Sequence, residues 1–245
     1  MLQDWFIIAI VVFAGATIQS AVGFGFGILI IPTLIYIDVQ PEVAIMISVL
    51  LVTLPNILTL NNLYKHVHVP SMIFLIILGA LVQPFGVWML GQLKTLSPNQ
   101  IKAFFGYMIL FVLVLQFLFK VKPRKNLHTG WGVLAFTASG LMGGFCGMHG
   151  PPLVIWTMTH DWSTQRIRGS LMLCYVIWAP LLTGILWYQH PNAGLAALKQ
   201  ASWALPIALM GLWLGLYLGK HFSRFILRGL AFFLLAFVAI LAIFG

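Results

Sequence analysis

The sequence is built from long apolar runs separated by short polar turns. Six of these runs have about the length that one helix needs to cross the hydrocarbon core of a membrane, which is roughly 20 residues. They are residues 43–60, 69–90, 101–119, 169–187, 201–218 and 225–244. The pattern therefore predicts an all-α polytopic membrane protein.

Two further runs, Trp5–Ile37 and Trp131–His160, are too long and too rich in glycine for one unbroken helix. Glycine inside a helix costs about 1 kcal/mol relative to alanine. In the first run Phe24 and Phe26 alternate with glycines instead of following a helical stripe. We expect the first run to form two arms, 5–20 and 27–37, and the second to break within 139–152. At 1.5 Å per residue the first two arms are about 24 and 17 Å long, too short to span the membrane comfortably.

The composition supports a membrane protein in contact with lipid. The chain is 61% hydrophobic and 7% charged, whereas about 25% of a soluble domain is charged. The net charge of +9 comes from Lys and Arg in short loops, which fits membrane topology better than a nucleic-acid partner. Cys146 and Cys174 both lie in apolar runs, so no structural disulfide is expected.

The order of segments repeats along the chain. A broken run followed by three single segments occupies residues 1–120, and the same order occupies 131–245 after a basic linker at 121–130. An offset of 124 residues places Gly23 on Gly147 and Leu29 on Leu153. These identities are few, so chance matching is the alternative to an internal duplication.

The loop charges decide between two ways of threading the broken runs. If each run crosses once, the 13 Lys and Arg residues divide 6 to 7 between the two faces, which gives the protein no preferred orientation in the membrane. If each run folds back as a hairpin, ten share one face and three the other, and such a bias sets orientation. The ten are Lys65, Lys120, Lys122, Arg124, Lys125, Arg166, Arg168, Lys220, Arg224 and Arg228, and the three are Lys94, Lys102 and Lys199.

We therefore predict two re-entrant helical hairpins, with the basic face and the linker cytoplasmic and both termini outside. Each half then has an odd number of elements, so the two halves run in opposite directions across the membrane. Inverted repeats with broken helices are a recurrent plan of secondary transporters, whose substrate binds near the midplane between the repeats.

Glycines 23, 25 and 27 at the first break, and Gly147 and Gly150 at the second, predict a site for a small anion. A helix that restarts at such a break presents N–H groups without acceptors and the positive end of its dipole. Glycine lets a ligand approach that backbone closely. The alternative is that these glycines only allow close helix packing.

Polar side chains beside the breaks extend this candidate site. They are Gln19 and Ser20 before the first break, Cys146 and His149 at the second, and Asn56 and Gln83 beside prolines in the single segments. Asn56 and Gln83 either line the cavity or satisfy carbonyls freed by the kinks. His149 is the only ionisable group that the hairpin topology places deep in the membrane. It is expected to bind the anion or carry a coupling proton, unless it is a neutral histidine bonded to the backbone.

The signature VGFGFGILIIPTL, its degenerate repeat GGFCGMHGPPLVIW and the basic central linker resemble the TauE/SafE sulfite exporter family of bacterial membrane proteins. The resemblance covers essentially the whole chain. It implies transport of small sulfur-containing anions, sulfite or organosulfonates, usually outward across the bacterial inner membrane. His149 and the Pro151–Pro152 pair depart from a glycine-only second signature.

We expect a secondary transporter of small anions that works by alternating access, with no catalytic residues, metal or cofactor. The four acids, Asp4, Asp38, Glu42 and Asp161, all lie at segment edges, and no HExxH, CxxC pair or Walker loop occurs. The rival functions are a passive anion channel and a membrane-embedded enzyme or sensor subunit. Nothing in the pattern indicates an oligomeric state.

Overall fold

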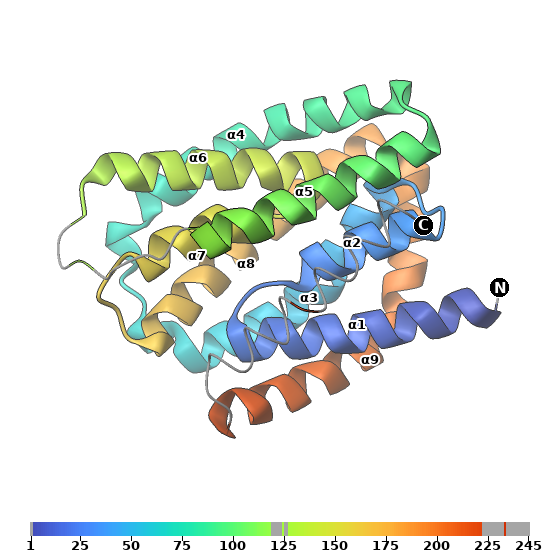
Figure 1. The fold of residues 1–245 in the computed structure, drawn as a ribbon. Helices are drawn as coiled ribbons and strands as arrows, with labels where there is room; N and C mark the ends of the chain where they lie inside the picture. The colour runs from blue at the N-terminus through green and yellow to red at the C-terminus, as the bar shows by residue number, and fades with distance from the viewer. Residues whose placement is uncertain (1, 119–123, 125–126, 222–232, 234–245) are drawn as a thin grey trace.

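The computed structural model describes residues 2–118, 124, 127–221 and 233. These residues form a bundle of α-helices joined by short turns (Figure 1). The α-helices are α1 Leu2–Val22, α2 Phe26–Tyr36, α3 Pro41–Leu63, α4 Ile73–Gln92, α5 Pro98–Leu118, α6 Thr129–Cys146, α7 Gly150–Met158, α8 Thr164–Gln189 and α9 Pro191–His221. Three short 3-10 turns, Tyr64–His66, Val69–Ser71 and Leu93–Thr95, lie between helices on either side of α4.

Both predicted helix breaks are confirmed. The first lies between α1 and α2, where Gly23 and Gly25 have φ of 101° and 115°. The second lies between α6 and α7, where Gly147 has φ of 71° and the amides of Gly147 and Met148 bond back to α6 carbonyls at 2.9 and 3.4 Å. In each pair the second helix runs back beside the first, and the two pairs enter the bundle from opposite ends (Figure 1).

The observed helices are longer than the predicted segments at several ends. The first arm extends over 21 residues as α1. Its apolar part, Phe6–Val22, is one of the helices shorter than a candidate membrane span, which agrees with the expectation that this arm does not span the membrane comfortably. Helix α8 begins five residues before the predicted Gly169, because the Ser163 hydroxyl accepts a bond from the Arg166 amide at 3.2 Å. The predicted segment 225–244 lies outside the described residues, apart from Phe233.

The helices pack in a reciprocal pattern. Helix α1 lies along α9, α4 lies along α6, and α3 packs against α8 between them. Glycines of α9 face α1, where a Cβ atom on Gly215 would overlap the carbonyl of Thr17. Similarly, a Cβ atom on Gly140 of α6 would overlap the carbonyl of Gly79 in α4. Small residues allow such close approach between membrane helices, so both outer pairs depend on glycine.

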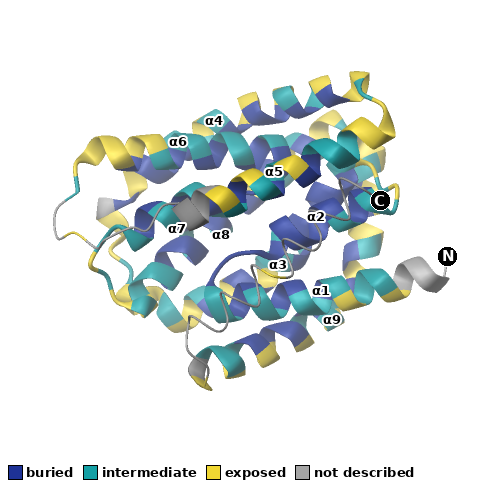
Figure 2. Ribbon diagram, in the orientation of Figure 1, coloured by how far each residue is buried: buried dark blue, intermediate teal, exposed yellow. Residues whose placement is uncertain are grey.

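The outward faces of the bundle are apolar. On α4 large exposed apolar side chains recur every three or four residues, as at Phe74, Ile77, Leu81, Phe85 and Trp88, and the buried residues gather in the interior (Figure 2). By length and composition, the stretches that could cross a membrane are Pro41–His66, Ile73–Thr95, Thr164–Gln189 and Pro191–Gly219; shorter apolar helices are Phe6–Val22, Phe26–Tyr36 and Pro98–Val114. The fold is thus an all-helical bundle suited to lipid.

Two of the acids lie at one end of the bundle and are paired with lysines there. The Lys94 Nζ atom is 3.7 Å from the Glu42 carboxylate, and the Lys102 Nζ atom is 2.8 Å from that of Asp38. These contacts join the α2–α3 turn to the α4–α5 turn (Figure 1). They confirm that Asp38 and Glu42 lie at segment edges rather than in the interior.

Replacing Gly140 with alanine tests the contact between α4 and α6. The added methyl group would overlap the Gly79 carbonyl, so Gly140→Ala is expected to destabilise the protein by about 1–3 kcal/mol. The measurement is thermal unfolding in detergent, followed by tryptophan fluorescence. The control is Gly184→Ala in α8, where a Cβ atom would meet nothing within 4 Å and the helix would gain up to about 1 kcal/mol. Equal melting temperatures for the two variants would contradict this packing.

Candidate functional site

A cavity of about 60 Å³ lies where the two helix breaks meet. A water molecule needs about 10–15 Å³ of such space, so the cavity is large enough for an ion of a few heavy atoms. The lining residues come from both breaks and from the two central helices α3 and α8. They are Gln19, Gly25, Phe26, Gly27, Ile28, Ser48, Val49, Val52, Asn56, Gly147, Met148, His149, Gly150, Tyr175 and Ala179.

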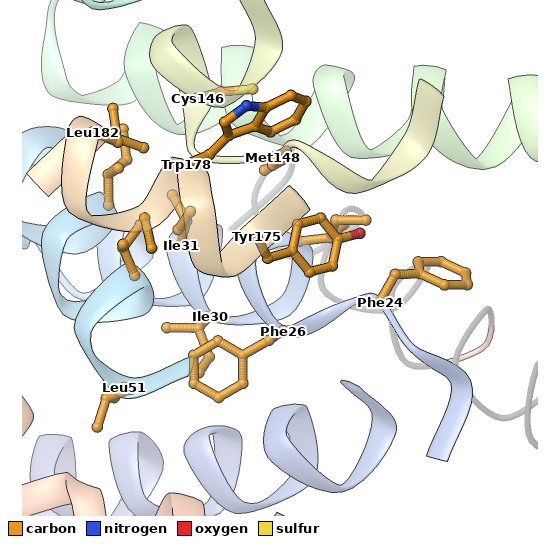
Figure 3. Close-up of a cluster of buried hydrophobic side chains, with 14 of the residues drawn as sticks. Phe24, Phe26, Ile30, Ile31, Leu51, Cys146, Met148, Tyr175, Trp178 and Leu182 are labelled. Carbon is orange, nitrogen blue, oxygen red and sulfur yellow. The ribbon is translucent and has the colours of Figure 1, made fainter. Parts of the chain in front are cut away.

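The two breaks touch through glycine. A Cβ atom on Gly27 would lie 3.0 Å from the carbonyl oxygen of Gly147, and one on Gly150 would lie 3.1 Å from the Tyr175 hydroxyl and 3.5 Å from the Cβ atom of Phe24. Figure 3 shows the Tyr175 ring with its hydroxyl directed toward Phe24. A side chain at either glycine would therefore crowd the opposite wall of the cavity.

Gln19 joins the first break to α3. Its Oε1 atom accepts a hydrogen bond from the Phe26 amide at 3.2 Å, and its Nε2 atom donates to Oδ1 of Asn56, also at 3.2 Å. The Nδ2 atom of Asn56 is buried and has no partner among the described residues. The two side chains therefore form a relay that begins at a backbone amide and ends in an unused N–H donor.

His149 is held from three sides at the second break. Its Nε2 atom is 3.3 Å from Nε2 of Gln83, and its ring centroid is 5.3 Å from that of Trp178. Its carbonyl accepts a hydrogen bond from the Ser139 hydroxyl. The imidazole also occupies the space where Gly143 lacks a side chain. Gln83 does not line the cavity, but it contacts His149, which does.

Helix α2 presents free backbone donors, whereas α7 presents few. The first residue of α2 to bond its own helix turn is Leu29, whose amide donates to the Gly25 carbonyl at 3.1 Å. The amides of Gly27 and Ile28 precede it and have no helical acceptor. In α7 the second and third residues are Pro151 and Pro152, which have no N–H. The backbone donors expected at the two breaks are therefore not equivalent.

Several buried polar atoms lack partners among the described residues. Besides Asn56 Nδ2 they include the hydroxyls of Tyr175, Ser20 and Ser170 and Oε1 of Gln83. Native proteins rarely leave such groups unsatisfied, and a bound polar ligand would satisfy those that face the cavity, Asn56 and Tyr175. Tyr175 and Ser48 were missed by the sequence analysis. Their only signal was an isolated hydroxyl in an apolar segment.

The structure brings most of the predicted site residues together. Those that line the cavity are Gln19, Gly25, Gly27, Asn56, Gly147, His149 and Gly150, and those that lie outside it are Ser20, Gly23, Gln83 and Cys146. The Ser20 carbonyl accepts a hydrogen bond from Nη2 of Arg168, and the Cys146 thiol donates to the Met142 carbonyl at 3.1 Å. Ser20 and Cys146 therefore use part of their polar groups within the helix framework.

The cavity offers neutral dipoles rather than fixed charges. Among the described residues no Lys, Arg, Asp or Glu lines it, and no three of the described His, Cys, Asp and Glu residues gather as a metal site. An anion there would be held by backbone amides, hydroxyls, an amide nitrogen and an imidazole. Hydrogen bonds to a charged partner contribute about 1.5–3 kcal/mol each.

Comparison with known proteins identifies related membrane exporters. The family model described as "Sulfite exporter TauE/SafE" matches residues 7–242. A curated protein of Cupriavidus necator, named "Probable sulfite/organosulfonate exporter TauE", is 25% identical over 223 residues, which cover 89% of this chain and 86% of that protein. No solved structure matches the chain significantly.

Replacing Gln83 with leucine tests how His149 is anchored. The change removes the group facing the imidazole nitrogen, and a buried polar atom that loses its partner costs about 1–3 kcal/mol. We expect a correspondingly lower melting temperature. Gln92→Leu, at the exposed end of the same helix, is the matched control and should melt like the wild type. If both variants have the melting temperature of the wild type, Gln83 does not stabilise His149.

Proposed function

Because the chain belongs to the TauE/SafE sulfite exporter family, we propose that it is a secondary transporter that exports a small sulfur oxyanion, sulfite or an organosulfonate. The observation that carries the proposal is the cavity between the two breaks, in which Asn56 and Tyr175 hold polar atoms without protein partners. An exporter family also agrees with the expectation that the chain is not an enzyme.

The anion would bind between the first break and α8. The amides of Gly27 and Ile28, at the positive end of α2, would donate to it, as helix N-termini do to anions generally. The Asn56 amide, the Tyr175 hydroxyl and the His149 ring would complete its shell. Such a shell is needed, because an ion removed from water is stable only when its oxygens are hydrogen-bonded.

The packing of the helices supports two inverted repeats, residues 1–120 and 131–245. In such a plan α1 corresponds to α6 and α4 to α9, so the contact of α1 with α9 should be repeated by that of α6 with α4. Both contacts occur, and α3 and α8, which also correspond, pack on each other. Alternating access would follow if one hairpin-bearing half rocked against the other around the anion.

The loop charges support an orientation that makes export favourable. With the basic end in the cytoplasm and both termini outside, the protein would sit in the bacterial inner membrane, whose potential is negative inside. That potential favours outward movement of an anion by about 2.3 kcal/mol per charge per 100 mV. Export would then need no ATP, and His149 is the group that would carry a coupling proton.

Uptake of labelled sulfite, sulfoacetate or taurine into proteoliposomes tests the function. We expect at least one of these to enter above the level of empty liposomes, and we expect Tyr175→Phe to raise the KM roughly tenfold or more because one bond to a charged ligand is lost. Tyr188→Phe on the same helix is the control, since Tyr188 is 89% exposed. If no anion enters, the transporter proposal is wrong, and currents at channel rates would favour a passive pore instead.

The same assay in the presence of a pH gradient examines His149. If His149 carries the coupling proton, His149→Ala should abolish the effect of the gradient on the transport rate. Transport that keeps both its rate and its pH dependence in this variant would remove His149 from the mechanism.

Labelling of single cysteines tests the orientation. Thr95→Cys and His66→Cys lie at opposite ends of α4 at exposed positions, while Cys146 and Cys174 are fully buried. In intact cells a membrane-impermeant maleimide should react with Cys at position 95, and with Cys at position 66 only after the cells are opened. The reverse pattern would show that the basic end is outside and would remove the proposed energetic basis for export.

A further inference from the structure

The relay from the Phe26 amide to Asn56 fixes the hydrogen-bonding character of one wall of the cavity. A backbone N–H can only donate, so the Gln19 atom 3.2 Å from it must be the amide oxygen. The other Gln19 atom is then the nitrogen, and its partner on Asn56 must be the oxygen. The Asn56 nitrogen is therefore the amide atom left without a protein partner, on a residue that lines the cavity.

From this relay we infer that Gln19 is a positioning residue that holds Asn56 as a hydrogen-bond donor and so makes the cavity select oxyanions in their fully deprotonated form. The inference rests on the proposed function and assigns to Gln19 a role other than direct contact with the ligand. Both of its amide atoms are engaged within the protein, so Gln19 acts on the anion through Asn56.

The selectivity follows because two hydrogen-bond donors, the Asn56 N–H and the O–H of a protonated ligand, cannot bond to each other. A fully deprotonated oxyanion can accept at once from the Asn56 N–H and from the Gly27 and Ile28 amides in any orientation. A protonated ion must keep its O–H away from all of these donors, so fewer of its orientations use every donor. The hydroxyls of Ser48 and Tyr175 can donate or accept and adapt to either ligand. The Asn56 amide cannot turn without breaking its bond to Gln19, so it discriminates between the two forms of the ligand.

Sulfite is a suitable probe, because it gains and loses a proton near neutral pH. The titratable groups on the cavity wall are His149 and Tyr175, and Arg168 contacts the Ser20 carbonyl next to Gln19. Protonation of His149 at low pH would add positive charge and strengthen anion binding. The relay predicts the opposite sign, namely weaker binding of total sulfite as the pH falls, so the two effects are distinguishable.

The experiment measures sulfite binding to the purified full-length protein by calorimetry at pH 8 and pH 6. The wild type should bind total sulfite more weakly at pH 6, by roughly tenfold for each pH unit below the pKa of the ion. Gln19→Met releases Asn56, which can then turn its oxygen toward a protonated ligand. We expect this variant to bind the ion more weakly at pH 8 and to show a pH 6 to pH 8 affinity ratio near one.

Two further variants separate this role from a structural one. Asn56→Leu removes the donor but leaves the bond between Gln19 and the Phe26 amide, and it should lose the same pH discrimination. Asn62→Leu, at the exposed end of the same helix, should behave as the wild type. General damage to the fold would weaken binding at both pH values alike and leave the ratio unchanged.

The outcomes distinguish this inference from the function on which it rests. Wild-type protein that binds no sulfite at either pH would overturn the proposed function and this inference together. Wild-type binding with the same pH ratio in Gln19→Met would overturn the role of Gln19 alone. A ratio that is lost in both Gln19→Met and Asn56→Leu supports it.

Discussion

Backbone amides at two interrupted helices must find partners inside a bundle that faces lipid, and the rest of the structure follows from this constraint. Interrupted backbone at membrane depth is tolerated only where protein or a polar cavity satisfies it. At the first break the Phe26 amide is bonded by Gln19, and at the second the Gly147 amide returns to the Gly143 carbonyl. At the first break the amides of Gly27 and Ile28 remain, and both residues line the cavity.

Glycine has two different structural roles in this chain, which are found at different positions. At residues 25 and 147 the backbone has a positive φ, which few other residues adopt without strain. At residues 79, 140 and 215 the backbone is helical and glycine lets a neighbouring helix approach. Close packing of the helices therefore fixes where the two breaks lie relative to each other.

Run lengths and glycine clusters were enough to predict the breaks, the order of the helices and the place of Gln19 and His149 beside the breaks. For Asn56 the sequence left two alternatives open, and the structure places it on the cavity wall. These patterns could not predict Tyr175 or Ser48, nor that Gln83 and Cys146 lie behind the wall. In a soluble helix the apolar stripe identifies the inner face. In a membrane helix both faces are apolar, so the pattern does not tell which side chains face inward. Helix α1 begins at Leu2 and ends at Val22, a few residues beyond both ends of the predicted arm 5–20, because run lengths do not mark where a helix stops.

The proline pair at the start of α7 makes the two interruptions mechanically unlike. Proline fixes its own φ, so Pro151 and Pro152 restrict the backbone at the start of α7. Backbone rotation at the second break is then left mainly to Gly147. At the first break, glycines with a positive φ, Gly23 and Gly25, lie on both sides of Phe24. Any bending should therefore occur mainly in the α1–α2 hairpin, while the α6–α7 hairpin keeps its shape.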